Sequence, residues 1–281
     1  MPPTSTMILP PSPAPRADGS GGPPRSRPWG WAVFGSVAAV VTLGFGVAQT
    51  VSVLAHDETT TTTEFAAQDV KVVDVDVENG RVRIVAGTGE SVRVTARISR
   101  GLVDTNHREE LEGDRLVLRA GCPTVLSAFC SVDYTVEVPA NVTIVAHSDD
   151  SGVSVSGIDG PIAASSENGA VLIDGGRAPE VVATSQNGDV ETVDLRARSV
   201  AVHSENGSVD VELLAAPEDV RARSVNGDVT VIVPDTGEAY AVDAESQNAS
   251  RAVGVPTDPR SGRSIDARSE NGDVTVASRV R

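Results

Sequence analysis

The stretch SENGSV, residues Ser204 to Val209, recurs along the second half of the chain with few changes. In each copy asparagine and glycine follow the serine after two and three positions, and an apolar residue follows after five. The other copies are SENGAV at 166–171, SQNGDV at 185–190, SVNGDV at 224–229 and SENGDV at 269–274. A repeat of this kind determines the architecture, so we interpret it before any local motif.

Apolar residues alternate with polar ones on both sides of the phrase. Around Ser204 they are Val200 and Val202 before the serine and Val209 and Val211 after it. A period of two is typical of strands, and Asn-Gly supplies the positive-φ residues of a tight turn. Each copy therefore predicts a strand, a turn and a second strand. The predicted turn residues are Asn79, Gly80, Asn168, Gly169, Asn187, Gly188, Asn206, Gly207, Asn226, Gly227, Asn271 and Gly272.

Two all-β architectures fit this pattern: a β-solenoid of stacked rungs, or a β-sandwich of antiparallel hairpins. Successive glycines at 152, 169, 188, 207 and 227 are 17 to 20 residues apart, which suits one solenoid turn. Along the chain, no two acidic residues are neighbours at the position one after each serine, and at the position four after it acidic and uncharged residues alternate. Alternation avoids repulsion between side chains about 4.8 Å apart in stacked rungs, so it favours the solenoid, with hydrogen-bonded serine and asparagine ladders.

One copy departs from the rule. In Ser246–Arg251 alanine replaces the glycine, arginine replaces the valine, and the insertion GVPTDPRSG follows at 254–262. The insertion is either a loop tolerated near the end of a stack or a protrusion that binds a partner. In the second case Arg251, Asp258 and Arg260 are the candidate contact residues.

The N-terminal part of the chain predicts a membrane anchor. Residues 1–28 contain nine prolines and predict a disordered cytoplasmic tail, and residues 29–55 carry no charge and are long enough for one transmembrane helix. Arginines precede this segment and acids follow it, so the N-terminus is expected in the cytoplasm and the remainder outside it. A cleaved signal peptide is the alternative. Beyond the anchor we expect a Thr-rich linker at 56–69, an N-terminal β region at 70–141 and solenoid repeats at 142–281.

The chemistry-bearing residues are few. Cys122 and Cys130 are the two cysteines, and outside the cytoplasm they predict a disulfide. The net charge of −16 argues against nucleic acid as a partner. No catalytic motif or metal-ligand spacing appears, so we expect no catalytic residue, metal or cofactor. His147 and His203 are expected on the same outward column, three rungs apart and solvated.

The anchor, the cysteine pair before SVDYTVEVP at 131–139, and the Ser-x-Asn-Gly-x-Val units together resemble the toastrack, or "putative adhesin", family. The resemblance implies a β-strand-repeat protein of the bacterial envelope without an established activity. We therefore expect a single-pass, non-catalytic binding or scaffolding module whose partner is an envelope protein or the cell wall. An accessory of envelope-stress signalling is the alternative, and a carbohydrate-active β-helix enzyme is a more remote one.

Overall fold

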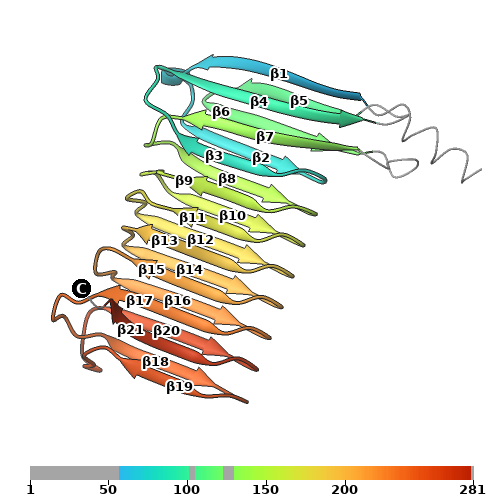
Figure 1. Cartoon of the computed structure of the whole chain (residues 1–281). Coiled ribbons are helices and arrows are strands. Elements are labelled where there is room, and N and C mark those ends of the chain that lie inside the picture. Colours follow the sequence, from blue (N-terminus) through green and yellow to red (C-terminus); the bar gives the residue numbers. More distant parts are fainter. Residues whose placement is uncertain (1–56, 101–104, 123–129, 280–281) are drawn as a thin grey trace, which may run out of the picture. The chain divides into compact units, whose positions relative to one another are not determined.

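The computed structural model describes residues 57–100, 105–122 and 130–279. These residues form 21 strands in two sheets and one short 3-10 helix, η1 (Ala67–Asp69), so the predicted all-β class is confirmed (Figure 1). The expected tail at 1–28 and anchor at 29–55 lie outside the described residues. Within the described part, no helix has the length and apolar character needed to cross a bilayer.

The first sheet has eleven strands. In spatial order they are β1 (Asp57–Ala66), β4 (Ser91–Arg100), β7 (Ser131–Val138), β3 (Val82–Ala86), β9 (Val153–Ser156), β11 (Val171–Asp174), β13 (Val190–Leu195), β15 (Val209–Leu213), β17 (Val229–Pro234), β21 (Val274–Arg279) and β19 (Arg251–Gly254). The second sheet has ten strands. They are β5 (Asn106–Glu112), β6 (Arg115–Gly121), β2 (Val72–Val77), β8 (Thr143–Ser148), β10 (Ile162–Ser166), β12 (Glu180–Ser185), β14 (Ser199–Ser204), β16 (Asp219–Ser224), β20 (Ser264–Ser269) and β18 (Ala241–Ser246).

Each copy of the repeat forms one rung, with a strand of the second sheet, a corner and a strand of the first sheet. Neighbouring rungs pair in parallel and in register, so that Ser204 lies between Ser185 and Ser224. The strands on either side of a corner belong to different sheets, as β14 and β15 do. This arrangement is the predicted solenoid and excludes antiparallel hairpins for the repeats.

The alternating apolar residues of both sheets form one core. Val200, Val202, Val209 and Val211 are each at most 3% exposed, and equivalent residues of the other rungs join them in a single cluster. Valine suits these positions because its β-branched side chain packs well on a pleated surface. The outward residues between them remain partly or fully exposed.

Hydrogen bonds of the serine and asparagine columns fasten one rung to the next at the corners. The Ser204 hydroxyl donates to the Gly188 carbonyl of the preceding rung at 2.9 Å and accepts the Gly207 amide of its own corner at 2.9 Å. The asparagines form the predicted ladder, in which each Nδ2 donates to the Oδ1 of its neighbour. The ladder runs through Asp150, Asn168, Asn187, Asn206, Asn226, Asn271 and Asn248.

The reason predicted for the corner glycines is wrong. Gly80 has a positive φ, but Gly207 and the other repeat glycines from Gly169 to Gly272 do not. They are required instead by close stacking, because a Cβ on Gly207 would lie 2.3 Å from the Gly188 carbonyl oxygen. Glycine is therefore needed for the approach of two backbones and not for left-handed geometry.

The segment 57–66 is a strand and not the expected linker. Its threonines favour extended structure, and β1 pairs antiparallel with β4 over ten residues. β4 and β7 are also antiparallel, as are β5 and β6, so the stack begins with antiparallel strands. Parallel stacking begins with β6 and β7, which pair in parallel with β2 and β3, and these in turn pair with β8 and β9. Solenoid stacking therefore begins before residue 142.

The last two rungs do not stack in chain order. The rung β20/β21 lies between β16/β17 and β18/β19, so the chain passes to the end of the stack and then returns (Figure 1). As a result Asp228 and Asp273 are neighbours, contrary to the alternation read along the chain. Their adjacency is tolerated because the Asp228 carboxylate accepts the Asp273 amide at 2.8 Å.

Candidate functional site

The copy that departs from the repeat forms the terminal rung, β18 with β19. Each of its strands has a sheet neighbour on one side only among the described residues. Ala249 takes the place of the corner glycine, and its amide still donates to the Ser246 hydroxyl at 3.0 Å. Arg251 occupies the register position of Val274 in the neighbouring rung. A charged residue can occupy this core column because the rung lies at the end of the stack.

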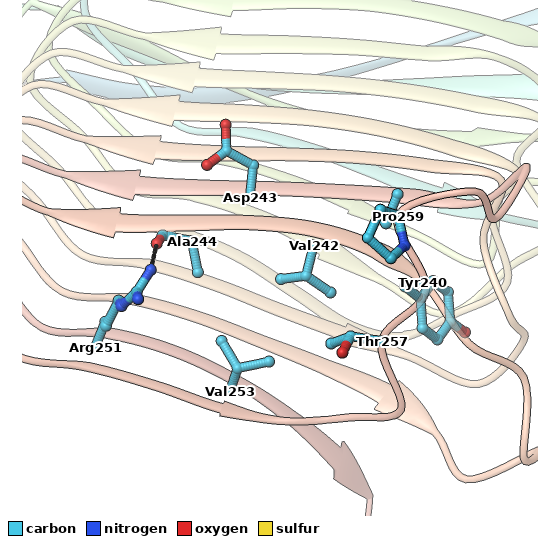
Figure 2. A pocket seen from close by; sticks show the side chains of 9 residues that line it. Tyr240, Val242, Asp243, Ala244, Arg251, Val253, Thr257 and Pro259 are labelled. Atoms are coloured by element: carbon cyan, nitrogen blue, oxygen red, sulfur yellow. Dashed lines mark hydrogen bonds between the residues drawn. The ribbon is translucent and has the colours of Figure 1, made fainter.

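A hollow of about 590 Å³ opens between the two strands of this rung. In Figure 2, Val242 of β18 and Val253 of β19 point toward one another across it, while Tyr240, Thr257 and Pro259 lie at one side. Val253 is 43% exposed, whereas the equivalent Val276 of the next rung is fully buried. The walls are therefore core positions of the repeat that no further rung covers.

Arg251 crosses the hollow from β19 to β18. Its Nη1 donates to the Ala244 carbonyl at 2.9 Å, a hydrogen bond drawn in Figure 2. A guanidinium in this column would be unpaired inside the stack, whereas at the end it reaches solvent. The outer edges of β18 and β19 also present backbone amides and carbonyls, so the surface combines apolar walls, one cation and strand edges. These are the groups that bind an added extended peptide.

The insertion at 254–262 is the connection that returns the chain to β20. Its backbone is held against the segment before β18, because Tyr240 donates its amide to Pro256 and accepts the Asp258 amide. The Asp258 carboxylate accepts the Arg260 amide at 2.9 Å, while the Arg260 side chain is exposed. Of the three predicted contact residues, Arg251 lines the hollow and Asp258 shapes the connection.

Tyr240 closes one side of the hollow and is 1% exposed. Burial, together with the nearby Glu238 carboxylate, raises the pKa of its hydroxyl, although Arg263 opposes this effect. The hydroxyl stays protonated and has no hydrogen-bond partner among the described residues. The buried ring of Tyr240 forms one wall of the hollow. Sequence reasoning missed Tyr240, Val242 and Val253 because each resembles an ordinary strand residue.

The other predicted site residues lie in the corners of the rungs and in the disulfide. All twelve turn residues lie in the corners between strands. Cys122 and Cys130 form the predicted disulfide, with 5.9 Å between their Cα atoms.

Comparisons with known proteins identify relatives of the chain. Residues 133–279 match the family model described as Toastrack DUF4097. No curated protein that was compared matches the chain. A "putative adhesin" of Bacteroides fragilis is 17% identical, with a TM-score of 0.47, over 79% of this chain and 97% of that one. A "putative cell adhesion protein" of Clostridium sporogenes is 10% identical, with a TM-score of 0.39, over 79% of this chain and 100% of that one.

Proposed function

The chain belongs to the Toastrack DUF4097 family, and we propose that it is a non-catalytic binding or scaffolding module at a bacterial cell envelope. Residues 29–55 anchor it as a single membrane helix, with the N-terminus in the cytoplasm and the β-solenoid outside. The sequence supports this placement through the uncharged segment, its flanking charges and the cysteine pair.

The module binds its partner at the terminal rung by strand addition. The observation that carries this proposal is the end of the repeat at β18 and β19, where core positions and strand edges lack the covering rung found elsewhere in the stack. An extended segment of an envelope protein would pair with one edge and place an apolar side chain between Val242 and Val253. Arg251 would favour a segment that carries an acidic residue.

Site-specific photo-crosslinking of the full-length protein in intact cells tests this proposal. A photoreactive residue at position 253 is expected to capture one protein, which mass spectrometry then identifies. The matched control is the same residue at Glu191, which is exposed on β13 in the middle of the stack. The same captured proteins from both positions, or none from position 253, would overturn the terminal rung as the binding site.

A further inference from the structure

A histidine and two carboxylates meet on the outer face of the second sheet, away from the terminal rung. They are His147 of β8, Asp149 of the following corner and Glu167 of the next corner. One ligand atom of each lies within 4.8 Å of the others. The stacking of β8 on β10 brings them together, because the Glu167 amide donates to the Ser148 carbonyl between His147 and Asp149.

The His147 ring is oriented from its other side. Nδ1 lies 2.8 Å from the hydroxyl of Ser165, the direct register partner of His147 on β10. Nε2 lies 2.7 Å from Asp149 Oδ1. A hydrogen bond at one imidazole nitrogen that orients the other is the arrangement found around metal-bound histidines.

The residues that directly follow the repeat serines have an unusual charge pattern near His147. In stacking order the residues after the serines, from Glu167 to the end, alternate between acidic and uncharged: Glu167, Gln186, Glu205, Val225, Glu270 and Gln247. On the other side of Glu167 this alternation fails, because Glu78, Asp149 and Glu167 are consecutive acidic residues in the stack. The Glu78 carboxylate is engaged by the Cys122 amide at 2.8 Å. Asp149 and Glu167 thus remain as an adjacent acidic pair, and this pair is where His147 lies.

The arrangement differs from a catalytic triad despite the line from Ser165 through His147 to Asp149. A triad places one carboxylate on the imidazole nitrogen that faces away from the serine. Here a second carboxylate is also close, because an oxygen of Glu167 lies within 4.8 Å of one His147 nitrogen and of an Asp149 oxygen. Two carboxylates and one imidazole nitrogen that converge on one point are a ligand set for a cation.

We propose that a divalent transition-metal ion binds between His147 Nε2 and the carboxylates of Asp149 and Glu167. An imidazole ligand favours such ions over Mg²⁺ or Ca²⁺. The ion takes the place of the proton between Nε2 and Asp149. In a neutral imidazole that proton moves through solvent to Nδ1, and the resulting Nδ1–H donates to the Ser165 hydroxyl, so that no net proton is released. Bonds of about 2.0–2.2 Å place tetrahedral ligand atoms about 3.4 Å apart. The side chains of His147 and Asp149 are 36% and 40% exposed and have room to open to this spacing.

Zinc titration of the full-length protein by isothermal calorimetry tests the site, with Zn²⁺ itself as the probe. His147→Ala is expected to remove one bound Zn²⁺ per chain. Glu167→Gln, an exposed and nearly isosteric change, is expected to weaken that site at least tenfold. The matched control is His203→Ala in the same outward column, where Val225 replaces a second acid in the next corner; it should retain wild-type binding.

A second readout distinguishes binding from a change in folding. The ¹⁵N resonance of His147 Nε2 should shift on addition of Zn²⁺, and thermal unfolding should show that both variants remain folded without metal. Unchanged Zn²⁺ stoichiometry and affinity in both His147→Ala and Glu167→Gln would overturn the proposal. An equal loss of Zn²⁺ binding in His203→Ala would also overturn the proposed site.

Discussion

The Asn206 side chain donates its Nδ2 to Asn187 Oδ1 at 2.8 Å, and its own Oδ1 accepts Nδ2 of Asn226 at 2.8 Å. An amide suits this position because it carries a donor and an acceptor at the same time. A carboxylate has no donor to offer. The donor-to-acceptor direction of the hydrogen bonds therefore continues from rung to rung only through asparagine. The first member, Asp150, only accepts a hydrogen bond, so a carboxylate is sufficient there.

Replacement of Asn206 by Asp should destabilise the protein. The carboxylate would lose the donor and turn an oxygen toward Asn187 Oδ1, at a cost of about 1–2 kcal/mol. Asp150→Asn is the matched control, because that position only accepts, and it should change stability by less than about 0.5 kcal/mol. Urea unfolding midpoints at constant slope measure both. Equal effects of the two changes would contradict the directional ladder.

Gly207→Ala tests the close approach of the rungs. The new Cβ would lie 2.3 Å from the Gly188 carbonyl oxygen, and the obstacle is backbone held on both sides. We expect a loss of at least about 2 kcal/mol, as in overpacked cores. Gly262→Ala, which meets no atom within 4 Å, should be nearly neutral. A mild effect at Gly207 in the same urea experiment would refute the stacking requirement.

Thr192→Val should stabilise the protein. Thr192 is 1% exposed, lies between Ile173 and Val211 in the core column, and its hydroxyl has no hydrogen-bond partner in the described structure. Removing an unsatisfied buried hydroxyl should add about 1 kcal/mol. The outward Thr230→Val on β17 serves as control and should have little effect. A fall in the melting temperature of Thr192→Val would show that the hydroxyl has an unseen partner.

Much of this architecture was predictable from the sequence. Strand, corner and rung follow from the valine columns and the spacing of the glycines, and the cysteine pair predicted its disulfide. The order of the last two rungs could not be predicted, because the strands that end at Ser246 and Ser269 carry the same pattern of apolar residues. Arg251 was the available signal, since a guanidinium in this core column reaches solvent only where one side of the rung is free.

The candidate sites were harder to predict for a different reason. His147, Asp149 and Glu167 are separated by up to 20 residues in the chain and converge only through the register of β8 and β10. The exposed core positions Val242 and Val253 look like those of any other rung in sequence. Their exposure depends on rung order, which local periodicity does not specify.

A pH dependence is expected from Asp74, which lies 2.6 Å from Arg115 and 2.9 Å from Arg119 and is 9% exposed. Burial alone would raise the pKa of its carboxyl, but the hydrogen bonds and charges of Arg119 and Arg115 outweigh burial and hold the pKa below its ordinary value. The unfolded chain therefore takes up the proton first. The stabilisation is complete above the ordinary pKa and is lost as pH falls through it toward the folded value.

Asp74→Asn isolates this contribution. At pH 7 the variant should be less stable by about 1.5–3 kcal/mol, the range for hydrogen bonds to charged groups. The difference from the wild type should shrink as the solution is acidified below pH 4. Urea midpoints measured at several pH values give both curves, and parallel curves would contradict the assignment.

Arg251→Val should make the terminal rung resemble the others. Without the guanidinium, the open ends of two molecules can associate through apolar walls and unpaired edges. We expect an apparent mass that rises with concentration in light scattering, compared with the wild type under the same conditions. A variant that shows the wild-type mass at every concentration would argue against Arg251 as the residue that limits association.

The spatial order of the final rungs affects when the last part of the stack can form during synthesis. During synthesis the segment 241–254 emerges before 264–279, yet its strands have no paired neighbour until β20 and β21 form beside them. A chain that stops short of its last eighteen residues would lose an interior layer and leave its end layer detached. The strands β20 and β21 therefore complete the stack, because they are the sheet neighbours of β18 and β19 among the described residues.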